Sequence, residues 1–78
     1  MILLVDVGNS RLKWVSGERG EFPLRGGAVH GEETWTELAA QQWGTLPHPE
    51  RALIVSVAGS EVRAALTDWI RKVWNIEA

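Results

Sequence analysis

The chain has 78 residues, about half the size of a usual domain, so it can bury one small core at most. Its 45% hydrophobic and 23% charged residues exclude a disordered chain, and the absence of cysteine excludes a disulfide framework and a thiolate zinc site, which fits a cytoplasmic protein. The net charge of −2 with scattered Lys and Arg excludes a basic stripe for nucleic acid, and no apolar run is long enough for a membrane span or, at MILLV, for a signal peptide.

The chain begins with two segments of strand character. Residues 2–7 form a continuous apolar run that reaches an acid, which is typical of a central strand buried on both faces. Gly8 and Asn9 then supply turn chemistry. Residues 11–16 alternate between apolar and other side chains and therefore predict a second strand.

Residues 17–29 are rich in turn-forming residues. Glycines around residues 17–20 predict a turn, and we expect a short third strand near residues 20–29. Pro23 lacks an N–H group and restricts this strand to the edge of a sheet.

A helix is predicted to follow the third strand. Thr34 and Glu37 have the spacing of a capping box, in which each side chain accepts a hydrogen bond from the backbone of the other residue. Gly44 is a suitable end. The residues at helical spacing on one side are Trp35, Leu38, Ala39, Gln42 and Trp43.

The last two predicted elements are a strand and a long helix. Residues 51–57 form a second apolar run, which favours a buried and parallel strand. A helix is expected from Ser60, because apolar residues recur at i, i+3 and i+4. These apolar residues are Val62, Ala65, Leu66, Trp69, Ile70 and Val73.

The predicted order is therefore β-β-β-α-β-α, which indicates an α/β fold with a mixed sheet. The crossover through the first helix makes the first and fourth strands parallel neighbours, so both apolar strands are expected to be central. Asp6 then lies at the carboxyl end of a central strand, where α/β sheets usually place ligands. A fifth strand is expected to begin near residues 74–78.

The polar cluster that follows the first strand has two interpretations. It is a tight hairpin whose polar residues bond to their own backbone, or it is the floor of a phosphate site. In the second interpretation, Asp6 holds a magnesium ion, and the N–H groups of Gly8, Asn9 and Ser10 form a nest for an anion. Lys13 adds a point charge.

The stretch DVGNSRLKW after MILLV resembles the first phosphate motif of the type III pantothenate kinases, also described as Bvg accessory factor proteins. LIVSVAGSEVRAAL, at residues 53–66, is similar to the fourth strand and following helix of that family. The resemblance implies a ribonuclease-H-like half-domain of the actin-like ATPase superfamily. It also implies that residues 1–78 are the amino-terminal part of the first lobe of a larger, two-lobed kinase.

The resemblance further implies ATP-dependent phosphorylation of pantothenate to 4'-phosphopantothenate, the first step of coenzyme A synthesis. By this match Asp6 positions the metal and the phosphates, Gly8, Asn9 and Ser10 line the ATP phosphate tail, and Lys13 assists. The implied cofactors are Mg²⁺ or another divalent metal and a monovalent cation, K⁺ or NH₄⁺, and the implied assembly is a cytoplasmic homodimer. The family's Gly-x-Asp-Arg segment and its second phosphate motif, which carries the catalytic acid, do not occur here. No catalytic residue is therefore expected within the chain, and we expect it to be inactive alone.

Other functions have weaker support in the sequence. The two histidines, His30 and His48, lack a second ligand at metal spacing and are expected to be loop residues. The five tryptophans lack interleaved basic residues, which favours a core role over a nucleic-acid platform. The alternative to a kinase segment is a non-catalytic actin-like interaction or regulatory module. In either case we expect the isolated chain to self-associate, through the outer edge of the strand at 51–57 or through tryptophan-bearing helix faces.

Overall fold

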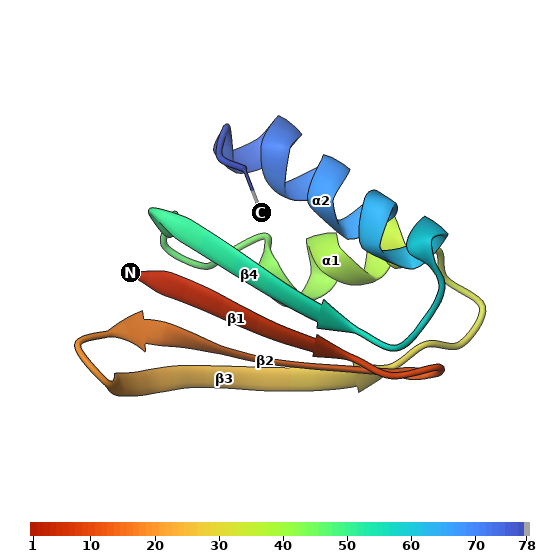
Figure 1. The fold of residues 1–78 in the computed structure, drawn as a ribbon, viewed down its shortest axis with the longest axis horizontal. Helices are drawn as coiled ribbons and strands as arrows, with labels where there is room; N and C mark the ends of the chain where they lie inside the picture. Colours follow the sequence, from red (N-terminus) through yellow and green to blue (C-terminus); the bar gives the residue numbers. More distant parts are fainter. Residues whose placement is uncertain (78) are drawn as a thin grey trace.

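The structure is a computed structural model that describes residues 1–77, and Figure 1 shows two helices packed on one face of a mixed sheet. The strands are β1 (Ile2–Val7), β2 (Arg11–Glu18), β3 (Glu21–Val29) and β4 (Arg51–Ser56), and the helices are α1 (Trp35–Trp43) and α2 (Ser60–Trp74). The sheet order is β3-β2-β1-β4, with β1 antiparallel to β2 and parallel to β4. The predicted α/β class, element order and parallel pairing are confirmed.

Strand β1 places alternate side chains on opposite faces of the sheet. Leu3, Val5 and Val7 point toward the helices and are buried in the core. Leu4 and Asp6 lie on the other face, where Leu4 is half-buried and Asp6 is exposed. The expectation that this strand is buried on both faces is therefore wrong for the side of the sheet that carries no helix.

Strand β4 is also not central. It lies at the end of the described sheet and pairs with β1 alone, because no other strand of residues 1–77 reaches its outer edge. Ala52 and Ile54 are buried under the helices, whereas Leu53 and Val55 are 58% and 65% exposed on the opposite face. An apolar run identifies a strand with a strong tendency for burial, but it does not show whether both faces are covered within the same chain.

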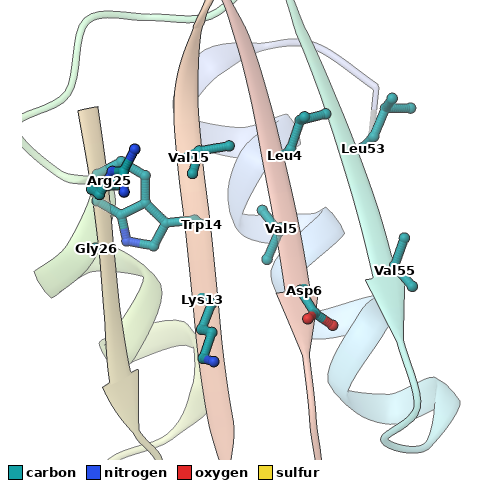
Figure 2. Close-up of a pocket in the computed structure, with 10 residues that line it drawn as sticks. All are labelled: Leu4, Val5, Asp6, Lys13, Trp14, Val15, Arg25, Gly26, Leu53 and Val55. Atoms are coloured by element: carbon teal, nitrogen blue, oxygen red, sulfur yellow. The ribbon is translucent and has the colours of Figure 1, made fainter. Parts of the chain in front are cut away.

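We call the side of the sheet away from the helices the open face. Its residues alternate in sequence with the core residues of the same strands, as the side-chain period of a strand requires. Figure 2 shows these side chains on one side of the sheet. The residues of the open face are Leu4, Asp6, Lys13, Val15, Arg25, Leu53 and Val55.

Tryptophan fills the space between the two helices and the sheet. Trp43 of α1 is fully buried, and its ring contacts Trp69 and Trp74 of α2 at centroid distances of 5.7 and 6.2 Å. Trp14 of β2 is buried too, and its indole Nε1 donates to Gln42 Oε1 of α1 at 3.1 Å. These four tryptophans therefore serve the core, and the helix faces that bear Trp43, Trp69 and Trp74 are not available for self-association.

The ends of α1 follow from local sequence. The Glu37 N–H donates to Thr34 Oγ1 at 3.1 Å, and the Thr34 N–H donates to Glu37 Oε1 at 3.3 Å, which confirms the capping box. The helix ends at Gly44, whose N–H donates to the Ala40 carbonyl at 2.9 Å. This residue is in a right-handed conformation, so α1 ends without the left-handed turn that a glycine usually provides.

Helix α2 buries a slightly different face from the predicted one. Leu66, Trp69 and Ile70 are buried as expected, but Val73 is 46% exposed and Trp74 takes its place in the core. Asn75 ends the helix with a left-handed φ of 57°. Residues 75–77 are not in a strand, so a fifth strand does not begin there, and Ala78 lies outside the described residues. Neither helix among residues 1–77 is long and apolar enough to cross a membrane.

Candidate functional site

Asn9 and Ser10 join β1 to β2 in a tight hairpin. The Gly8 N–H donates to the Arg11 carbonyl at 2.8 Å and closes the turn. Asn9 and Ser10 are exposed, and their backbone N–H groups have no intramolecular partner among residues 1–77. The predicted nest consisted of three N–H groups. The Gly8 N–H is bonded within the hairpin, so only the N–H groups of Asn9 and Ser10 remain for an anion.

Asp6 of β1 and Lys13 of β2 occupy opposite positions on neighbouring strands. The strand register pairs these two residues directly, and Figure 2 shows both side chains on the open face. Both are exposed, and the described chain gives the Asp6 carboxylate no hydrogen bond or ion pair. The structure thus brings one free carboxylate and one ammonium group beside the Asn9–Ser10 turn.

Gly8 has room for a side chain as far as this chain is concerned. An added Cβ would come no closer than 3.8 Å to the Arg11 carbonyl oxygen, which is an ordinary contact, and Gly8 does not have a positive φ. Gly17 differs, because a Cβ there would clash with the Glu21 backbone. The fold therefore requires glycine at position 17 but not at position 8, which leaves a close approach from outside as a reason for Gly8.

Two further loops reach the same edge of the sheet. The His30 N–H donates to the Ser10 carbonyl at 2.7 Å, so the β3–α1 loop lies against the hairpin. The Val57 N–H donates to the Val7 carbonyl at 3.0 Å, so the β4–α2 loop lies on the other side of it. Figure 1 shows these three connections together at one end of the sheet. This edge is the carboxyl end of the parallel strands, where ligands are usually bound.

The donor set at this edge is compatible with a phosphate-bound divalent cation but not with a metal held by protein alone. Within residues 1–77, no three His, Asp or Glu side chains gather closely enough to hold a metal ion. Magnesium is commonly bound through one or two carboxylates together with substrate phosphate oxygens. Asp6 supplies one such carboxylate, exposed and unpaired.

The sequence identified the turn and its two charged neighbours, but it did not identify their surroundings. Arg25 of β3 lies on the open face opposite Val15, two residues further along the sheet from the turn than Lys13, and adds a cation to that face. The ring of His30 stacks on Trp35 with a centroid distance of 4.2 Å and an interplanar angle of 4°. Both the position of Arg25 and the stack of His30 depend on the register of β3, and the turn-rich sequence of residues 20–29 specifies this register poorly.

Comparison with known proteins gives a consistent result. A model of the family described as type III pantothenate kinase matches residues 2–78. Similar proteins named type III pantothenate kinase occur in Dichelobacter nodosus, at 35% identity over 75 residues, and in Nitrosococcus oceani, at 32% over 76 residues. Another, from Leptothrix cholodnii, is 39% identical over 77 residues.

These relatives are much longer than the chain. The matches cover 96%, 97% and 95% of this chain but only 30%, 29% and 29% of the three relatives, respectively. The chain therefore spans less than a third of the length of the curated relatives it matches.

Proposed function

The chain belongs to the type III pantothenate kinase family, and from this premise we propose that it provides the first ATP-phosphate-binding segment of a longer enzyme. That enzyme transfers the γ-phosphoryl group of ATP to the hydroxyl of pantothenate and forms 4'-phosphopantothenate. The Asn9–Ser10 turn carries the proposal, because it combines exposed polar groups and two free N–H donors with a charged pair at the carboxyl end of β1.

Each residue of the turn has a proposed role in holding the phosphates. The N–H groups of Asn9 and Ser10 and their side chains donate to phosphate oxygens, and Gly8 lets those oxygens approach the backbone. Lys13 offsets their negative charge. Phosphoryl transfer depends mainly on such positioning and charge stabilisation, so a segment that only binds phosphate still contributes to the rate.

Asp6 is the proposed protein contact of a divalent metal such as Mg²⁺. The ion, when bound, neutralises charge on the phosphate oxygens. The backbone of Asp6 is held in place, because it lies within β1 between the paired strands β2 and β4. A monovalent cation, K⁺ or NH₄⁺, is proposed for the complete enzyme from the family alone.

We further propose that residues 1–78 are part of the first lobe of a two-lobed, ribonuclease-H-like kinase and are inactive alone. The open face supports this, because Leu53 and Val55 of β4 are 58% and 65% exposed, and Val57, which directly follows the strand, is 76% exposed. Such a patch is unusual on a complete soluble domain and indicates a surface that further protein covers. A cytoplasmic, homodimeric enzyme is proposed on the same family basis.

Titration of the full-length protein with ATP and magnesium tests the proposal. We expect saturable binding and transfer of phosphate to pantothenate, and we expect the isolated 78-residue chain to transfer none. A matched pair of variants makes the test specific to the site: Asn9→Ala should weaken ATP binding, whereas Asn75→Ala, at the far end of α2, should not. A full-length protein that folds but binds no ATP would instead support the non-catalytic actin-like interaction module.

A further inference from the structure

An aromatic pair connects the phosphate turn to helix α1. His30 follows β3 directly, and its ring lies parallel to the Trp35 ring at 4.2 Å. The backbone N–H of His30 also donates to the Ser10 carbonyl at 2.7 Å. A continuous path of contacts therefore runs from α1, through the stacked rings, to the second residue of the turn.

The β2–β3 register explains why His30 lies beside Ser10. Arg11 pairs with Val29 in the antiparallel ladder, and the bond from His30 to Ser10 extends this ladder by one residue. Residues opposite each other in such a ladder have neighbouring side chains on the same face. By alternation this is the face of Leu12 and Ala28, which is the helix-covered one.

Trp35 is a fixed platform for the histidine ring. It is the first residue of α1 and directly follows Thr34, which is held in the capping box with Glu37. Its indole is half-buried and packs against the core cluster. Because both the backbone and the ring of Trp35 are held, the stacked His30 is restrained with them.

The imidazole is poorly placed to act as a phosphate ligand itself. One of its faces is covered by Trp35, and the ring is half-buried. The loop that follows carries two carboxylates, Glu32 and Glu33, and α1 begins with a third, Glu37. The negative charge of these carboxylates disfavours the binding of a phosphate next to the His30 ring.

We propose that His30 and Trp35 are positioning residues for the phosphate turn. Their stacking holds the end of β3, and the His30 N–H then fixes the Ser10 carbonyl. The fixed carbonyl restrains the backbone of Ser10, whose hydroxyl and N–H are proposed phosphate donors. This role rests on the proposed function of the turn in ATP binding, and it assigns to α1 a part in that binding although the helix contributes no ligand.

Substitution of His30 in the full-length enzyme tests the proposal. His30→Ala removes the stack and should raise the Michaelis constant for ATP about two- to tenfold, the range that stacking of aromatic pairs provides, while the constant for pantothenate stays unchanged. His30→Phe keeps a flat ring and should restore the wild-type value. His48→Ala, which changes the other histidine of the chain, an exposed loop residue near Trp74, is the matched control and should have no effect.

Amide hydrogen exchange without nucleotide measures the link separately from activity. The amides of residue 30 and its neighbours should exchange faster in His30→Ala than in the wild type or His30→Phe. The midpoint of thermal unfolding should be the same in all three proteins. Unchanged exchange and unchanged ATP kinetics in His30→Ala would overturn the proposal, and so would a His30→Phe variant as impaired as His30→Ala, since the imidazole would then be the ligand. A wild-type enzyme that binds no ATP would overturn the proposed function instead, while the exchange result would still decide whether the stack holds the turn.

Discussion

Val5 and Val55 lie on adjacent parallel strands, yet they differ widely in exposure. Val5 faces the helices and is 3% exposed, whereas Val55 faces the other way and is 65% exposed. Both come from apolar runs that look equally suited to a core. Within residues 1–77, the two helices cover one face of the sheet, while the open face has apolar side chains that no element covers. One face therefore stabilises the fold, and the other exposes apolar side chains and, at its edge, the charged residues of the proposed phosphate site.

The largest effect is expected from removing a large buried side chain from the helix-covered face. Trp43→Ala should lower the free energy of unfolding of the chain by about 3–5 kcal/mol, because Trp43 is fully buried between both helices and the sheet. Val55→Thr, which keeps a β-branched side chain at an exposed position of the open face, should change this free energy by no more than about 0.5 kcal/mol. Chemical denaturation followed by tryptophan fluorescence measures both values. Similar losses in the two variants would mean that the open side is covered by this chain after all.

Asp6 offers a second contrast, between a charged group of the open face and the core beneath it. Asp6→Asn in the full-length enzyme should reduce phosphoryl transfer about 100-fold or more, because it removes the proposed metal contact. Thermal stability should stay nearly unchanged, since the carboxylate has no partner within residues 1–77. The control is Asp68→Asn, which removes a surface carboxylate that pairs with Lys72 at 2.9 Å. Loss of folding together with normal turnover in the surviving protein would contradict the role of Asp6.

Substitutions of Gly8 and Gly17 distinguish an effect on the proposed phosphate site from an effect on the stability of the fold. Gly8→Val should raise the Michaelis constant for ATP about tenfold and leave that for pantothenate unchanged, because the side chain fits the chain but obstructs the phosphates. Gly17→Val should instead destabilise the whole fold, since its Cβ meets the Glu21 backbone. Steady-state kinetics and unfolding midpoints distinguish the two outcomes. Equal changes in both Michaelis constants for Gly8→Val would indicate a general folding defect.

Self-association is expected to be the smallest of these effects and to depend on the open face. The isolated chain should form dimers or larger species at micromolar concentration, because β4 has both an unpaired edge and exposed apolar side chains. Val55→Lys should shift the chain toward monomer, whereas Val73→Lys, on the exposed side of α2, should not. Sedimentation velocity measures this shift. A wild-type chain that remains monomeric would show that the open face does not mediate self-association.

The outer edge of β4 is partly occupied, which limits how strongly it can pair. Arg63 of α2 donates from its guanidinium to the Ile54 carbonyl at 2.9 Å. An incoming strand on that side of β4 would have to displace this bond. Arg63→Ala should therefore increase association of the isolated chain, and no change would locate the contact on the open face alone.

The sequence by itself determined the parts of the fold that depend on near neighbours. The capping box at Thr34, the hairpin after β1 and the alternation of β2 were all predictable, because each depends on residues a few positions apart. The positions of Asp6 and Lys13 on either side of the hairpin were predictable for the same reason, and the binding of phosphate there stays a prediction. A local pattern fixes the conformation of a segment and the face on which each side chain lies.

Only the tertiary structure decided which of those faces is covered. The order β3-β2-β1-β4 leaves β4 at an edge, and the position of both helices on one side leaves Val55 exposed. It also brings His30 onto Trp35 and uses the Gly8 N–H within the turn. These features depend on contacts between segments distant in sequence, and an apolar or polar residue type does not specify its partner in such contacts.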